Sequence, residues 1–164
     1  MDQAYLIATL SPLTWPVGTS VGALIHSRWA RRRGGGDLLE LWIRWWLLGG
    51  MALGALTIAV TFWIVPRFMA QSMGYPTGPY QFEVSCTNMA FAVMAVLCVP
   101  RREPRLVVLI GFAVFMWGAA LGHIYQSLAH HNLTPGNNGG ILVYDIGLPA
   151  LLLVLVLRQR RREW

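Results

Sequence analysis

Long apolar runs separated by short polar segments dominate the chain. Runs of about 17 to 23 residues are long enough, as helices, to cross a hydrocarbon core of about 30 Å. The pattern predicts five such helices, covering residues 4–25, 42–65, 82–99, 106–128 and 141–157. The first has the weakest pattern, because two prolines, Pro12 and Pro16, interrupt it.

The composition supports a membrane protein. Of the 164 residues, 55% are hydrophobic and only 12% are charged, whereas soluble domains carry about 25% charged residues. We therefore expect one all-α domain, residues 1–164, folded as a polytopic transmembrane helix bundle in the lipid bilayer. The net charge of +6 would favour a nucleic-acid partner in a soluble protein. Here the basic residues flank the apolar runs, so membrane topology accounts for them and no nucleic-acid partner is expected.

The arginines predict the orientation. All 13 basic residues are arginine, and with five spans and a cytoplasmic C-terminus all of them except Arg67 fall on the cytoplasmic side. The N-terminus then lies outside. Trp45 and Trp46 at the inner end of the second span, and Phe62 and Trp63 at its outer end, fit interface anchors. Because the absence of lysine is typical of GC-rich codon usage, we expect a multi-pass protein of the bacterial inner membrane.

Three of the predicted spans contain two glycines four positions apart. Such pairs allow helices to approach closely, and in lipid this packing drives helix association. We interpret them mainly as contacts within the chain, with docking of a partner subunit as the alternative. The pairs are Gly18/Gly22, Gly50/Gly54 and Gly118/Gly122.

Several polar side chains lie inside the apolar runs. Counting about 1.5 Å per residue from the nearest cytoplasmic arginine puts Asp145 and Asn88 about 20 Å above the inner boundary. The same count puts His123 and Glu83 at about 27 Å, and Gln126 shares a helix face with His123. Ionisable groups at such depth are costly unless they are partnered. We therefore predict that these five residues form a polar intramembrane site towards the outer leaflet.

Asp145 has a second unusual feature, because Pro149 lacks the N–H that the carbonyl of Asp145 would accept. Asp145 thus offers both its side-chain carboxylate and a backbone carbonyl that accepts no hydrogen bond within the helix. Three uses stay open: hydrogen bonds that hold helices together, with Asp145 paired to His123; a proton, ligand or substrate site; and a partner's docking groove. We expect exposed loop positions for His130 and His131, and turn chemistry for residues 137–140. No chelating histidine or cysteine spacing is present, so neither a metal nor a cofactor is expected.

Four short motifs carry a resemblance to a known family. They are FEVSCTNMAF, GHIYQ, NNGG and DIGLP, all between Trp42 and Leu157. On these motifs the chain resembles a family of small, uncharacterised bacterial integral membrane proteins. The resemblance implies that Glu83, Asn88 and His123 belong to one site with Asp145. The family has no established activity, so the resemblance implies no reaction.

No nucleotide-binding loop and no hydrolase nucleophile motif occurs in the sequence. We expect an accessory or scaffolding subunit of a larger membrane complex, of importer or respiratory type, partnered by other subunits or by a second copy. The alternative is a small proton- or cation-coupled carrier with an outward-facing pocket that uses Asp145 and His123. A membrane-embedded enzyme acting on a lipid, with His123 and Glu83 or Asp145 as acid–base pair, is the third reading. The absence of catalytic motifs favours a protein that is not an enzyme.

Overall fold

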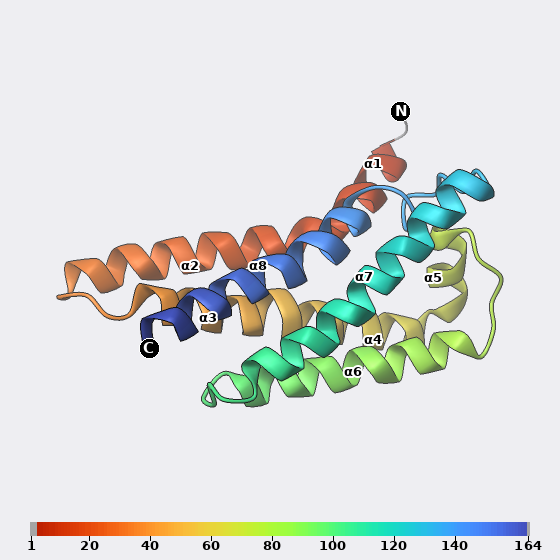
Figure 1. Ribbon diagram of the computed structural model, residues 1–164. Coiled ribbons are helices and arrows are strands. Elements are labelled where there is room, and N and C mark those ends of the chain that lie inside the picture. Colours follow the sequence, from red (N-terminus) through yellow and green to blue (C-terminus); the bar gives the residue numbers. More distant parts are fainter. Residues whose placement is uncertain (1–2, 164) are drawn as a thin grey trace.

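The computed structural model describes residues 3–163, and these residues are helical apart from short connections (Figure 1). No strand occurs among them. The elements in chain order are α1 (Gln3–Leu10), the 3-10 turn η1 (Ser11–Leu13), α2 (Thr14–Arg32), α3 (Leu38–Trp45), the π-helix η2 (Trp46–Leu53), α4 (Gly54–Ile64), α5 (Pro66–Met73), α6 (Tyr80–Cys98), α7 (Arg105–Ala129) and α8 (Gly140–Glu163).

Within residues 3–163, four helices are long and apolar enough to cross a membrane. They are Leu38–Ile64, which joins α3, η2 and α4, then Tyr80–Cys98, Arg105–Ala129 and Gly140–Arg162. These confirm four of the five predicted spans as candidate membrane helices. The expected span over residues 4–25 is divided between α1 and α2 by η1, at the position of Pro12, and its crossing of the membrane stays a prediction.

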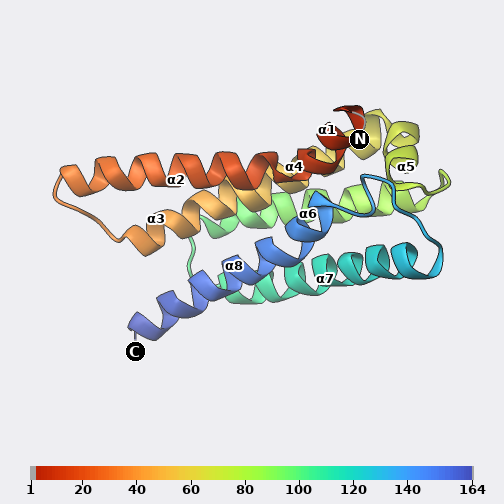
Figure 2. The same cartoon turned by 90° about the horizontal axis from the view of Figure 1, so that it is seen from above.

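The N-terminal helices nevertheless lie along the bundle. Figures 1 and 2 show α2 beside α3, with α1 towards the opposite end of the molecule. Small buried side chains at i, i+4 and i+8, Thr19, Ala23 and Ser27, form the inner face of α2. Its outer face carries exposed apolar side chains such as Val21 and Ile25. An apolar outer face of this kind suits contact with lipid.

The core lies where the long α3–η2–α4 helix meets α6, α7 and α8. Its fully buried side chains include Leu47, Leu109 and Leu152, and the rings of Phe91 and Phe112 meet edge to face with centroids 5.2 Å apart. Close van der Waals packing of these side chains holds the helices together.

The π-helix η2 brings α8 close to the middle of the long helix. The N–H of Gly54 bonds to the carbonyl of Met51, and the carbonyl of Gly50 accepts a hydrogen bond of 3.0 Å from the hydroxyl of Tyr144. A Cβ atom on Gly54 would lie 2.0 Å from that hydroxyl, and one on Gly50 would lie 2.9 Å from Leu148 Cδ1. Both glycines of this pair therefore serve packing within the chain, at a local widening of the helix.

The other glycine pairs differ from Gly50/Gly54. A Cβ atom on Gly22 would lie 2.5 Å from the ring of Trp45, so Gly22 also permits a close helix contact. Gly18, Gly118 and Gly122 have nothing within 4 Å of such an atom. Internal packing of residues 3–163 therefore does not require glycine at these three positions.

Candidate functional site

Two buried polar networks lie near opposite ends of α7 and α8. The first, here called the Asn137 cluster, comprises Tyr75, His123, Ser127, Asn132, Asn137 and Asp145. The second, here called the Arg105 network, comprises Glu40, Arg44, Arg102, Arg105 and Gln159.

Asn137 is the centre of the first cluster and is completely buried. Its Nδ2 atom lies 2.8 Å from the carbonyl of Asn132, 3.1 Å from Ser127 Oγ and 3.3 Å from the carbonyl of His123. Carbonyl oxygens only accept hydrogen bonds, so the amide nitrogen must face this side. The amide oxygen of Asn137 therefore faces the opposite side, towards the histidine ring.

This orientation determines which nitrogen of His123 carries hydrogen. Asn137 Oδ1 accepts a hydrogen bond of 2.9 Å from the hydroxyl of Tyr75 and lies 2.8 Å from His123 Nδ1. Burial raises the pKa of the Tyr75 hydroxyl above its ordinary value, so this group remains a donor. Because an amide oxygen cannot donate, His123 Nδ1 must carry the hydrogen. The other ring nitrogen, Nε2, is then the atom that faces Asp145.

Asp145 lies in the first third of α8, and its side chain is 4% exposed. Its Oδ2 atom is 3.7 Å from His123 Nε2, which is longer than a hydrogen bond of about 2.7–3.2 Å. A bare carboxylate facing an imidazole lone pair in an apolar environment would be repelled and poorly solvated. The pair therefore requires one proton, carried either by the imidazole or by the carboxyl group. Geometrically, His123 and Asp145 form a proton-holding pair.

The Asn137 cluster also ties the connection between α7 and α8 to the corner after α5. Asn132 Nδ2 donates to the carbonyl of Met73 at 2.7 Å, and the N–H of Gly136 donates to the carbonyl of Ser72 at 2.9 Å. Gly74 ends α5 in the left-handed conformation, with φ of 69°, and a Cβ atom there would lie 2.6 Å from Asn132 Oδ1. Glycine is required at this position for both reasons.

The structure separates the predicted site residues. His123 and Asp145 lie in contact. Asn88 is buried, but its side-chain amide donates to a carbonyl of its own helix, and Glu83 is exposed on the first turn of α6. Gln126 is half-buried. Among the described residues, the structure gives these last three side chains no hydrogen bond or ion pair to His123 or Asp145.

The sequence predicts only turn chemistry for Asn137, which organises the cluster, and it predicts no role for Tyr75. The available signal was the polar stripe His123, Gln126 and Ser127 on α7, which needs hydrogen-bonding partners from a neighbouring segment. The asparagine-rich connection that follows α7 was the nearest source of such partners.

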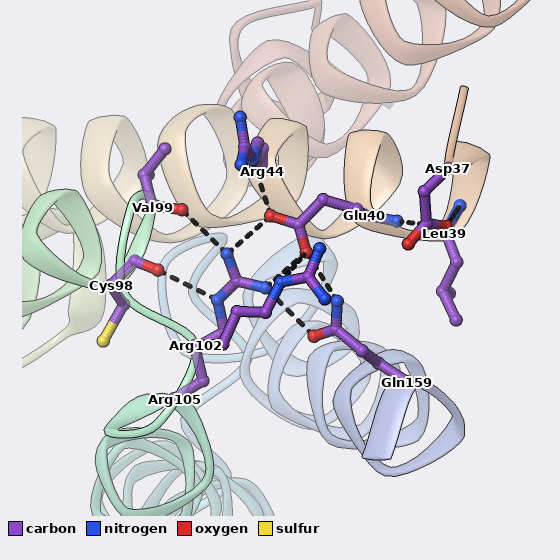
Figure 3. A network of polar contacts seen from close by, with 9 residues as sticks. All are labelled: Asp37, Leu39, Glu40, Arg44, Cys98, Val99, Arg102, Arg105 and Gln159. Atoms are coloured by element: carbon purple, nitrogen blue, oxygen red, sulfur yellow. Dashed lines mark hydrogen bonds and ion pairs between the residues drawn. The ribbon is translucent and has the colours of Figure 1, made fainter. Parts of the chain in front are cut away.

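The Arg105 network is centred on an arginine with no exposed surface (Figure 3). Its guanidinium binds Glu40 in the bidentate manner, with Nη1–Oε2 of 2.8 Å and Nη2–Oε1 of 2.9 Å. Two further N–H groups donate to the carbonyls of Cys98, at 2.9 Å, and Val99, at 2.7 Å. These carbonyls belong to the C-terminal end of α6, so Arg105 also fixes the turn that precedes α7.

Glu40 collects further partners from three parts of the chain. Arg44 Nε lies 2.6 Å from Glu40 Oε1, Arg102 Nε lies 3.3 Å from Oε2, and Gln159 Nε2 donates to Oε2 at 2.5 Å. Gln159 Oε1 in turn accepts a hydrogen bond of 3.0 Å from Arg105 Nη1. Helices α3, α7 and α8 and the turn between α6 and α7 therefore meet at one carboxylate.

The second span predicted from the sequence begins at residue 42 and leaves Glu40 outside it, and the predicted role of the arginines is topology alone. The helix begins at Leu38, because Asp37 caps it by accepting the N–H groups of Leu39 and Glu40 at 3.1 and 3.2 Å. The signal was present in the sequence: Asp37 and Glu40 have the three-residue spacing of a capping box. The earlier start places Glu40 on the helix, with its side chain inside the bundle.

Within residues 3–163, no three histidine, cysteine, aspartate or glutamate side chains gather as a metal site would require. In the Arg105 network, three arginines surround the carboxylate of Glu40. The fold and these networks define a small all-helical protein with four candidate membrane helices.

Comparison with protein families matches residues 9–164 to the family of unknown function DUF6790, so the chain belongs to that family. No curated protein and no solved structure gives a match. The resemblance seen in the sequence is confirmed in one respect: the chain belongs to a family of unknown function. The bacterial and membrane character that it implied for the family remains a prediction.

Proposed function

We propose that the chain is a small multi-pass membrane protein that serves as an accessory subunit of a larger membrane complex, and that α7 is the helix that binds its neighbour. The observation that carries this proposal is an exposed face of α7 whose residues follow one another at alternating intervals of four and three. This face, here called the α7 seam, consists of Val107, Gly111, Val114, Gly118, Leu121, Tyr125 and Leu128.

The spacing of the α7 seam is that of helices that wind around one another. An interval of 3.5 residues keeps one face of a helix against its partner over several turns. Helix α7 is also the least covered of the four candidate membrane helices: 28% of its most apolar window is buried, against 39–50% for the others. The seam thus extends, exposed, over most of the helix, and within residues 3–163 the ring of Tyr125 meets that of His130 near its end.

The glycines of α7 add a second reason. A Cβ atom on Gly111, Gly118 or Gly122 would have nothing within 4 Å, so these glycines lie along an open face. Acyl chains adapt to any apolar surface and need no glycine, whereas a partner helix gains close backbone contact from it. A transmembrane helix of another subunit fits these features.

The association is tested with the full-length chain expressed at its native level and extracted in a mild detergent. Gly111→Leu and Gly118→Leu, combined, fill the seam and raise helix propensity by about 1 kcal/mol per site, so the chain itself should stay folded. Gly147→Leu is the matched control, since Gly147 is exposed on α8 and also has nothing within 4 Å. We expect a stoichiometric partner with the parent chain and the control, and its loss with the seam variant.

An unpartnered parent chain would contradict the accessory role. A seam variant that keeps its partner would contradict the assignment to α7. If the co-purified species is a second copy of the chain, the accessory role is wrong and α7 is a dimerisation helix.

We further propose that the arginine-rich end is cytoplasmic, in a bacterial inner membrane, with the N-terminal helices as a fifth crossing. The end of α2, the turn between α6 and α7 and the end of α8 lie towards the same end of the bundle (Figure 2). The arginine clusters of the chain occur in these segments, which supports this orientation by the positive-inside rule. The Asn137 cluster then lies on the outer side.

The pair His123–Asp145 supports a second candidate, a proton-coupled carrier or binder. A buried pair that holds one proton, on a helix that contains Pro149 one turn after Asp145, is a feature of proton-linked membrane proteins. Asp145→Asn cannot exchange that proton, so it should abolish proton-linked uptake or ligand-dependent stabilisation. Asn88→Ala is the control on a neighbouring helix. Unchanged proton-linked activity in Asp145→Asn would exclude this candidate.

A further inference from the structure

At the corner between α4 and α5 the surface is hollowed, with a cavity volume of about 460 Å³. The hollow is open rather than enclosed, so a molecule bound there would remain partly exposed. The walls come from the end of α4, the start of α5 and the start of α6. They include Phe62, Trp63, Arg67, Gly78, Gln81 and Phe82.

The side chain of Gln81 holds this corner together. Gln81 is 4% exposed, its Nε2 donates to the carbonyl of Pro66 at 2.5 Å, and its Oε1 accepts the N–H of Gly78 at 3.0 Å. A single buried amide thus joins the first residue of α5, the connection after α5 and the first turn of α6. The walls are therefore preorganised, which lowers the entropic cost of binding.

The position of the hollow relative to the candidate membrane helices indicates what can reach it. One candidate helix ends at Ile64 and the next begins at Tyr80, so the hollow lies where both leave their apolar stretch. The rings of Trp63 and Phe82 are 46% and 65% exposed at its rim. Aromatic rings at this level are typical of the head-group region of a bilayer.

Arg67 supplies the charge of the hollow. Its side chain is exposed, and no carboxylate of the described residues lies within ion-pair distance of it. Glu83, the nearest acidic residue along α6, does not line the hollow. A guanidinium binds a phosphate through two parallel hydrogen bonds. An unpaired guanidinium beside apolar rings matches a molecule with an anionic phosphate and an apolar body.

We infer that this hollow binds a phospholipid, with the phosphodiester on Arg67 and the first part of the acyl chains against Trp63 and Phe82. The aromatic rim favours a lipid over a free phosphate, because a free phosphate has no apolar part to contact the rings of Trp63 and Phe82. The inference rests on the proposed membrane location but not on the accessory role, because the hollow is separate from the α7 seam and from both polar networks.

The inference is tested by native mass spectrometry and thermal unfolding of the full-length chain in detergent, titrated with a soluble short-chain phosphatidylglycerol. Replacing Arg67 by Gln should weaken binding by roughly tenfold or more, the effect expected for losing a charge-assisted hydrogen bond. Arg162→Gln, an exposed arginine near the C-terminus, is the matched control and should bind as the parent chain does. Phe82→Ala should weaken binding of the lipid as well.

The probes identify which part of the molecule is recognised. A diacylglycerol of the same chain length and glycerol phosphate should each bind much more weakly than the complete lipid. If inorganic phosphate or glycerol phosphate binds as tightly as the lipid, the site is one for a free anion and the inference is wrong. Equal lipid binding by Arg67→Gln and the parent chain would also overturn it.

Discussion

Arg105 and Glu40 are 65 positions apart in the chain, yet they form a bidentate ion pair in which the arginine side chain has no exposed surface. The pair joins the start of α7 to the start of α3, and Gln159 adds α8 to the same contact. An isolated arginine or glutamate in this position would be a buried, unpaired charge. We therefore regard the Arg105 network as the main set of polar contacts that holds the helices together where α3 and α7 begin and α8 ends.

The first prediction follows from this pairing. Glu40→Ala leaves Arg105 buried without its carboxylate, so the free energy of unfolding should fall by about 3–5 kcal/mol. The measurement is denaturant or thermal unfolding of the purified chain in detergent. Glu103→Ala, an exposed glutamate in the turn before α7, is the control and should change the free energy by less than about 0.5 kcal/mol. Equal effects of the two changes would show that the buried pair does not hold the bundle.

A second prediction concerns Asn137. Asn137→Ala removes the amide that Tyr75, His123 and Ser127 share, so several buried polar groups lose a partner, each at about 1–3 kcal/mol. We expect a much lower melting temperature, measured by differential scanning fluorimetry. The neighbouring change, Asn138→Ala, should have little effect, because the structure gives the Asn138 side chain no hydrogen bond among the described residues. A similar loss for both variants would contradict the central place of Asn137.

The third prediction is the tautomer of His123. Since Asn137 Oδ1 can only accept, ¹⁵N NMR of histidine-labelled protein should show His123 with hydrogen on Nδ1 and none on Nε2 when the ring is neutral. The exposed His130 serves as the internal reference, because its tautomer is not fixed by a buried hydrogen-bonding partner. In Asn137→Ala, if it folds, the fixed tautomer should be lost. A neutral His123 ring that carries hydrogen on Nε2 in the parent chain would refute the assigned network.

A fourth prediction tests the contact of the π-helix with α8. In Gly54→Ala the added Cβ would lie 2.0 Å from the hydroxyl of Tyr144, and overpacking should cost about 1–3 kcal/mol. Adding Tyr144→Phe removes the clashing oxygen and should recover part of that loss, measured as the midpoint of unfolding. Gly147→Ala has open space around it and should be neutral or stabilising. If Tyr144→Phe recovers no stability, the loss in Gly54→Ala does not come from a clash with the Tyr144 hydroxyl, and the prediction is wrong.

Much of the helical arrangement could be predicted from the sequence, because a run of apolar residues long enough to cross a bilayer has few other stable structures. The four candidate helices follow the predicted ranges closely. The first predicted span differs, since its apolar run contains Pro12, which lies inside the 3-10 turn that divides α1 from α2.

The site was harder to predict than the helices. Depth counting placed Asp145 and His123 within about five residues' rise of each other, and the structure places them in contact. The same counting grouped Asn88 with Asp145, although depth carries no information about direction around a helix, and Asn88 bonds to its own helix instead. Asn137 and Glu40 act through long-range contacts that no local spacing indicates, so their roles appear only in three dimensions.

The central claim, that α7 docks against another membrane subunit, is tested most directly by site-specific photo-crosslinking in intact membranes. A photoreactive residue replaces Val114 on the α7 seam in one variant and the equally apolar, exposed Val143 on α8 in another; these side chains are 69% and 62% exposed. We predict one discrete protein adduct, of the chain with a different subunit, from position 114 and none from position 143. Lipid adducts alone at position 114, or the same protein adduct from both positions, would contradict the claim.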